Sequence, residues 1–97
     1  MIVMKIWERK ITLDDDGYKT VVGITKNIDN VEKIKDLYND QVKVSEYYIN
    51  NMEYSSKQDD YDIELMNASD IYQVREVIDN ILDLYRSDDS IRLVSIY

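Results

Sequence analysis

The sequence contains no cysteine, no histidine, no proline and no phenylalanine among its 97 residues. Without cysteine and histidine there is no thiolate nucleophile, no imidazole base and no ligand set for a structural zinc site. The remaining nucleophiles are serine and threonine hydroxyls that lack a histidine base, and lysines in charged surroundings. The only two glycines, Gly17 and Gly23, do not form a phosphate-binding loop motif. We therefore expect a protein that is not an enzyme and that binds no cofactor.

Long apolar runs are also missing. No stretch approaches the roughly 20 apolar residues that a membrane span needs. The apolar segment at residues 1–6 is too short for the core of a signal peptide and lacks a small-residue cleavage site. The absence of cysteine is typical of a reducing compartment. We expect a cytoplasmic protein that does not contact a membrane.

Apolar residues are nevertheless sufficient for one small core. Isoleucine, leucine and valine together supply 28 residues, well above the fraction at which charged chains stay disordered. The length fits one domain, and no linker, proline-rich segment or low-complexity tract divides it. We expect a single domain over residues 1–97.

Several segments alternate apolar and polar residues, as β-strands with one covered face do. A turn-forming cluster at residues 14–17 separates the first two of these segments and predicts a β-hairpin. A polar turn at residues 55–60 separates the next two and predicts a second hairpin. A last strand is expected at the end of the chain. The predicted strands lie near residues 1–13, 18–24, 42–54, 61–65 and 91–97.

Two other segments have the helical period. A short helix is expected over residues 29–39, where Asp29 and Glu32 have the spacing of a capping box. A longer helix is expected from a cap at Asn67 or Ser69 to about Arg86. Its amphipathic stripe consists of Ile71, Val74, Ile78, Ile81 and Tyr85. The resulting order, ββαββαβ, predicts a small α+β domain whose mainly antiparallel sheet of about five strands is packed by one short and one long helix.

The acidic excess is concentrated in the C-terminal part of the chain. Residues 1–58 carry 9 basic and 10 acidic side chains, whereas residues 59–97 carry 3 basic and 10 acidic ones, a net charge of −7. On the predicted strand at 61–65, Asp60, Asp62 and Glu64 would point outward about 6.5–7 Å apart. This spacing resembles the phosphate repeat of an extended nucleic-acid strand.

The long helix carries a second acidic row. Glu76, Asp79 and Asp83 lie at i, i+3 and i+7, nearly opposite the apolar stripe, and Tyr72 falls on the same outer face. Two interpretations compete: the carboxylates solvate the outer face of a small domain, or they form a surface that mimics a nucleic-acid backbone. On the second interpretation, the candidate partner-binding residues are Asp59, Asp60, Asp62, Glu64, Tyr72, Glu76, Asp79 and Asp83.

Two acidic clusters invite a metal interpretation. An EF-hand loop that began at Asp14 would have Thr25 where its closing glutamate is required. Asp59, Asp60 and Asp62 could hold a hard cation, but no glycine shapes that segment. We expect no metal site.

Nine tyrosines and one tryptophan are the only aromatic residues. Tyr38, Tyr61 and Tyr85 lie on apolar stripes and are expected to fill the core in place of phenylalanine. A second group is expected to be partly exposed, where tyrosine often anchors protein interfaces. These residues are Tyr47, Tyr54, Tyr72 and Tyr97.

Three features of the chain can be compared with known classes of protein: the short length, the absence of cysteine, and the acidic rows at residues 59–64 and on the long helix. In these respects it resembles the small acidic inhibitors encoded by phages and mobile elements, including anti-CRISPR proteins, which commonly block the nucleic-acid channel of a Cas effector. Acidic immunity proteins that neutralise nuclease toxins are similar in the same bulk terms. The resemblance is compositional, and no functional residue follows from it.

The sequence therefore predicts an acidic inhibitor whose partner is a nuclease or Cas effector with a basic surface, acting in the host cytoplasm if a phage encodes it. No direct nucleic-acid binding is expected, because the acidic excess repels phosphates. The alternatives are an immunity or antitoxin protein that neutralises a toxin, and a structural or regulatory protein that self-associates as a homodimer through a face with Tyr47 and Ile49.

Overall fold

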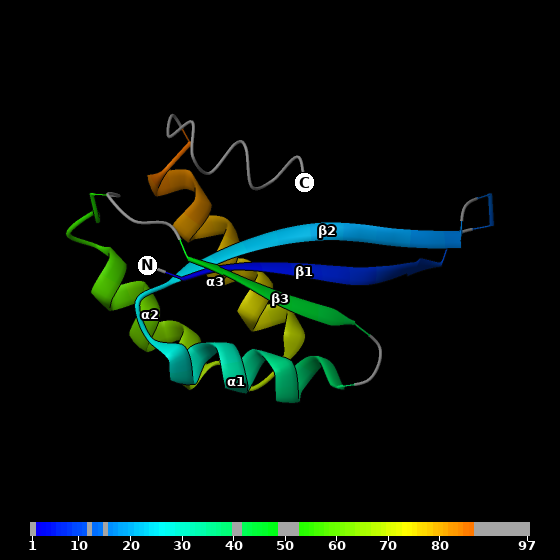
Figure 1. Ribbon diagram of the computed structural model, residues 1–97, viewed down its shortest axis with the longest axis horizontal. Helices are drawn as coiled ribbons and strands as arrows, with labels where there is room; N and C mark the ends of the chain where they lie inside the picture. Colours follow the sequence, from blue (N-terminus) through cyan, green and yellow to red (C-terminus); the bar gives the residue numbers. More distant parts are fainter. Residues whose placement is uncertain (1, 12, 15, 40–41, 49–52, 87–97) are drawn as a thin grey trace.

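A computed structural model of the chain describes residues 2–11, 13–14, 16–39, 42–48 and 53–86. Within these residues the elements are, in order, β1 (Ile2–Ile11), β2 (Asp16–Thr25), α1 (Ile28–Tyr38), β3 (Lys43–Tyr48), α2 (Gln58–Asn67) and α3 (Ile71–Leu84) (Figure 1). They form an α+β fold with one antiparallel three-stranded sheet in the order β2-β1-β3. The described part therefore contains three strands and three helices, not the predicted five strands and two helices.

The register of the sheet decides which side chains face the helices. Met4 of β1 is opposite Gly23 of β2 and Glu46 of β3. A Cβ atom on Gly23 would lie 3.0 Å from Met4 Cε and 3.3 Å from Ile78 of α3, so the even-numbered residues of β1 point toward α3. Because side chains alternate along a strand, the odd-numbered residues of β1 point to the opposite face.

The central strand β1 is buried on both faces. Val3, Met4 and Ile6 have no exposed surface, which matches the apolar character of both faces at the start of the sequence. α3 contributes Val74, Ile78 and Ile81 to the same core, also without exposed surface. The end of β1 and the start of β2 extend together beyond β3 and the helices (Figure 1).

The first hairpin, the short helix and the long helix are confirmed. Their ends differ in detail. α1 begins after Asn27, whose side chain accepts a hydrogen bond from the backbone N–H of Asp29. α3 is capped by Asp70, which accepts from the N–H of Gln73 at 2.9 Å, and not by Asn67 or Ser69. Gly17 lies within β2 opposite Lys10 rather than in the turn.

The strand predicted at 61–65 is wrong, because these residues belong to helix α2. Its buried residues, Gln58, Asp62 and Leu65, are spaced at i, i+4 and i+7, as on one side of a helix. The second hairpin is therefore absent from the described residues, and β3 stands without it. The predicted strand at 91–97 lies outside the described residues.

Candidate functional site

Helix α2 separates the carboxylates that a strand would have aligned. Asp59, Asp60 and Glu64 are exposed on its outer side, whereas Asp62 is only 8% exposed and faces the interior. The predicted outward row of Asp60, Asp62 and Glu64 is consequently wrong in its geometry. Asp62 does not present its carboxylate to a partner in this conformation.

The Asp62 carboxylate joins α2 to the end of β2. It accepts hydrogen bonds from Thr25 Oγ1 at 2.8 Å, from the backbone N–H of Lys26 at 3.1 Å and from Gln58 Nε2 at 3.0 Å. Asn30 Nδ2 of α1 donates to Thr25 Oγ1 and to the Asp62 backbone carbonyl, each at 3.1 Å. A buried carboxylate with this many donors stabilises the fold, so Asp62 has a structural role.

The same network continues into α3 through Gln58. Gln58 Nε2 also donates to the carbonyl of Ile24 at 3.2 Å, and the Tyr85 hydroxyl donates to Gln58 Oε1 at 2.7 Å. Burial raises the pKa of the Tyr85 hydroxyl, although the backbone N–H of Ser55 that donates to it acts in the opposite direction. The hydroxyl therefore stays a donor at neutral pH.

Asp59 is exposed but already has a neighbouring cation. Lys26 Nζ lies 3.2 Å from Asp59 Oδ1 and 4.3 Å from the centre of the Tyr54 ring. An exposed ion pair of this kind contributes at most about 1 kcal/mol. Asp59 can therefore exchange Lys26 for a cation of a partner at little cost.

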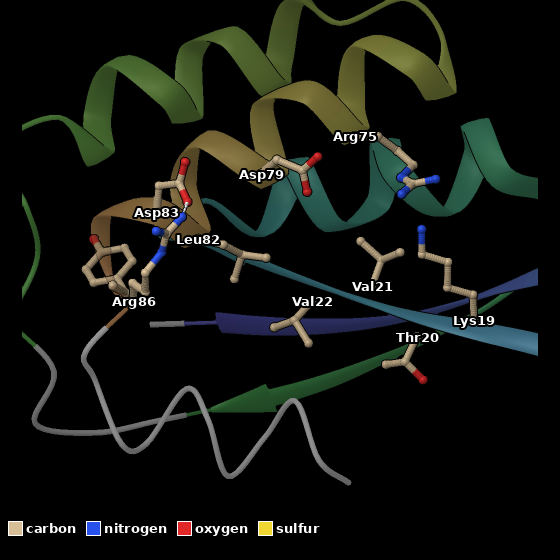
Figure 2. A pocket seen from close by; sticks show the side chains of 10 residues that line it. Lys19, Thr20, Val21, Val22, Arg75, Asp79, Leu82, Asp83 and Arg86 are labelled. Atoms are coloured by element: carbon tan, nitrogen blue, oxygen red, sulfur yellow. Dashed lines mark hydrogen bonds and ion pairs between the residues drawn. The ribbon is translucent and has the colours of Figure 1, made fainter.

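One groove runs between α3 and β2 and contains two of the candidate residues, Asp79 and Asp83 (Figure 2). Its volume is about 490 Å³. Three cations share it, and one of them, Arg86, forms an ion pair with Asp83. This groove is consequently of mixed charge and not an acidic surface. Its lining consists of Lys19, Thr20, Val21, Val22, Arg75, Asp79, Leu82, Asp83, Tyr85 and Arg86.

A second groove, between α2 and α3, brings the two acidic rows together. Glu64 of α2 and Glu76 of α3 both line it, and its volume is about 310 Å³. The other lining residues are Asn67, Ala68, Gln73, Val77 and Asn80. Its described lining contains two carboxylates, three amide side chains and no cation. We name these seven residues the acidic groove.

The acidic side chains of α3, which are Glu76, Asp79 and Asp83, lie between these two grooves, and we call them the ridge of α3. Glu76 faces the acidic groove, whereas Asp79 and Asp83 face the groove beside β2. Tyr72, 86% exposed, lies one turn before Glu76 in α3. The amide residues were missed from the sequence, although Gln73, Glu76 and Asn80 share the i, i+3, i+7 spacing of the acidic row. Carboxylate and amide oxygens at a common hollow can accept hydrogen bonds from an arginine or lysine side chain.

A partly buried polar contact links α1, β1 and α3. The Tyr38 hydroxyl donates to Glu8 Oε1 at 2.7 Å, and Arg75 Nη1 donates to Glu8 Oε2 at 3.0 Å. Burial, followed by the hydrogen bond to Glu8, raises the pKa of Tyr38 well above its usual range, and the Arg75 charge offsets only part of this shift. Tyr38 therefore stays neutral in the folded protein at pH values where an unfolded tyrosine ionises.

The raised pKa of Tyr38 predicts part of the stability that the protein loses at alkaline pH. A raised pKa in the folded state means that the contribution of Tyr38 is fully present below about pH 10, the value of an unfolded tyrosine, and is lost as the pH rises above it. Tyr38→Phe removes this ionisation, so its free energy of unfolding should fall less than that of the wild type between about pH 9 and pH 11. Urea unfolding at several pH values measures the two slopes. Tyr72→Phe, at an exposed position, is the control and should keep the wild-type slope; a wild-type slope for Tyr38→Phe would contradict the prediction.

In the described part of the chain, no three acidic side chains lie close enough together to hold a metal ion. None of the described helices has the length and apolar composition needed to cross a membrane. The side chain of Tyr47, together with Ile49 and Tyr97, falls outside what the structure describes. Tyr38 and Tyr85 are buried as predicted, whereas Tyr61 is half-buried.

The chain matches no protein-family model, and neither a curated protein sequence nor a solved structure is significantly similar to it.

Proposed function

We propose that this chain is a non-enzymatic inhibitor that occupies the basic nucleic-acid-binding surface of a nuclease, in the manner of an anti-CRISPR protein acting on a Cas effector. Such a protein would be encoded by a phage or mobile element and would act in the host cytoplasm. The surface assigned to the partner consists of the acidic groove, the exposed carboxylates of α2 and the ridge of α3.

The observation that supports this proposal is the acidic groove. Glu64 and Glu76 come from different helices and line one hollow. Because the described lining of this hollow contains no cation, an arginine or lysine of a partner would meet negative charge that none of these lining residues neutralises. Asp59 and Asp60 extend the same sign of charge along the exposed side of α2. Complementary charge of this kind speeds association and selects a basic partner.

Tyr72 supplies an anchor next to the acidic groove. An exposed tyrosine offers a large flat surface at low cost in conformational entropy and can stack on the guanidinium of an arginine. The carboxylates would then accept hydrogen bonds from the same or a neighbouring arginine. Asp62 has no part in this interface, because its carboxylate is engaged within the fold.

A neutralising pair of substitutions tests the acidic groove. The wild-type protein is titrated into DNA-cleavage reactions of a panel of purified CRISPR effectors and nuclease toxins, and inhibition of at least one of them is expected. Glu64→Gln with Glu76→Gln should raise the half-inhibitory concentration against that enzyme by about tenfold or more. Inhibition should also weaken as the salt concentration rises.

The matched control removes the same charge from another helix. Glu32 and Asp36 are exposed on α1, so Glu32→Gln with Asp36→Asn should change the half-inhibitory concentration less than about twofold. The half-inhibitory concentration of the double variant Asp79→Asn with Asp83→Asn tests separately whether the two ridge residues that face β2 contribute to inhibition. Equal inhibition by the groove variant and the α1 variant, or no inhibition of any enzyme in the panel, would overturn the proposal.

A further inference from the structure

The sheet face that points away from α3 is buried at its centre. The buried side chains belong to odd-numbered residues of β1 and to the residues of β2 that pair with them. They are Val3, Lys5, Val22 and Ile24, and each is at most 5% exposed. On an open sheet face a lysine keeps its ammonium group in water, so the burial of Lys5 means that another part of the protein lies over this face.

The described helices do not supply this cover, because their contacts are with the other face. α3 packs against Gly23, and Tyr38 of α1 donates a hydrogen bond to Glu8. Asp62 of α2 accepts a hydrogen bond from Thr25. The three strand residues in these contacts share the register of the even-numbered residues of β1. All three helices accordingly lie on one side of the strands in Figure 2.

The described loop before α2 is also engaged elsewhere. Lys26, which directly follows β2, lies with its Nζ 4.3 Å from the centre of the Tyr54 ring, and the backbone N–H of Ser55 donates to the Tyr85 hydroxyl of α3. A second copy of the chain is not needed either, since the four side chains are buried within a single chain. The cover therefore comes from residues of this chain outside the described part.

We infer that this face is the docking surface for the C-terminal segment of the same chain, residues 87–97. The segment follows Arg86, which lines the groove beside β2 together with Val22, so the chain reaches the edge of the sheet next to this face. Eleven residues can span up to about 36–40 Å, whereas the outer strands of a three-stranded sheet are only about 10 Å apart. The segment is also rich in apolar residues, which are Ile91, Leu93, Val94, Ile96 and Tyr97.

The segment at residues 49–52 is a poorer occupant. It has four residues, two of them asparagines, and it must connect β3 to residue 53. Its reach is at most about 14 Å, and it offers one isoleucine and one methionine. The C-terminal segment has both the length and the apolar side chains to cover the face from β2 to β1.

Paired cysteines test this contact in the 97-residue chain, which has no cysteine of its own. Val22→Cys is combined in turn with Ile91→Cys, Leu93→Cys, Val94→Cys or Ile96→Cys, and disulfides are detected by non-reducing electrophoresis after mild oxidation. At least one pair should form an intramolecular disulfide, which requires Cα atoms about 4.4–6.8 Å apart.

Val21→Cys is the matched control for Val22→Cys. Val21 is the adjacent residue and is equally buried, but it is opposite Ile6 and so shares the face that α3 covers. Its pairs with the same four positions should form no disulfide. Absence of every intramolecular disulfide with Val22→Cys, disulfides between two chains only, or equal disulfide formation by Val21→Cys would overturn the inference.

Thiol labelling of the single variants gives a second readout that does not depend on disulfide geometry. Leu93→Asp with Val94→Asp changes two neighbouring apolar residues, so one of them is affected whichever side faces the sheet. Maleimide labelling of Val22→Cys should then become about tenfold faster or more, because losing one buried apolar side chain lowers the cost of opening this face. Labelling of Val21→Cys should change less than about twofold, and equal acceleration at both positions would contradict a local cover.

The same variant separates this inference from the proposed inhibitor surface. The acidic groove lies between α2 and α3, on the helical side of the sheet. Leu93→Asp with Val94→Asp should therefore leave the half-inhibitory concentration against a nuclease unchanged, whereas Glu64→Gln with Glu76→Gln should leave the labelling rate of Val22→Cys unchanged.

Discussion

Replacing Asp62 with alanine is expected to lower the free energy of unfolding by about 3 kcal/mol or more, although Asp62 is only one of seven acidic side chains in α2 and α3. The substitution leaves the hydroxyl of Thr25, the backbone N–H of Lys26 and the amide of Gln58 without their common acceptor. Each buried donor left without a partner costs about 1–3 kcal/mol. Because small domains are stable by only about 5–15 kcal/mol, a loss of about 3 kcal/mol would remove between roughly one fifth and three fifths of the total stability.

Urea unfolding followed by far-ultraviolet circular dichroism measures this loss. Asp60→Ala is the matched control: it removes the same side chain two residues away on the exposed side of α2, and its effect should stay within about 0.5 kcal/mol. Asp62→Asn should fall between the two, because an amide keeps one oxygen acceptor but places N–H groups where the other oxygen accepted. Equal stabilities of Asp62→Ala and Asp60→Ala would contradict the buried network.

The burial of Asp62 also explains why the sequence predicts a strand at residues 61–65, where the structure has helix α2. Tyr61, Ile63 and Leu65 alternate as in a strand, yet Ile63 is 60% exposed. The side that is buried carries Gln58, Asp62 and Leu65, and two of these three residues are polar. Hydrophobic periodicity cannot detect a buried stripe whose members are held by hydrogen bonds. The groups that form these hydrogen bonds lie on β2 and α1, which are remote in sequence, so the local pattern of residues does not reveal them.

Elements whose buried side is apolar were predictable. The apolar stripe predicted for α3 is confirmed for Val74, Ile78, Ile81 and Tyr85, all of which are buried. The alternation of apolar and polar residues also predicted β1 and β2 correctly. The row of Glu76, Asp79 and Asp83 was also placed correctly on the outer side of α3. Its division between two grooves was not predictable, because it depends on how α2 and β2 pack against α3. Sequence spacing fixes a face of one helix and not the neighbour of that face.

Lys5→Met is expected to have the opposite sign and to raise the free energy of unfolding by about 1–4 kcal/mol. The Lys5 side chain is buried on the sheet face away from α3, opposite Val22 and Ser45. Its ammonium has no hydrogen-bond partner in the described residues, so it loses hydration without an ion pair in return. Methionine has a similar length and shape and removes this cost while keeping the apolar contacts of the lysine stem.

The control for Lys5→Met is Lys19→Met, at an exposed position of β2, which should change the free energy of unfolding by less than about 0.5 kcal/mol. A loss of stability in Lys5→Met would contradict the prediction and would indicate that the ammonium has an acceptor.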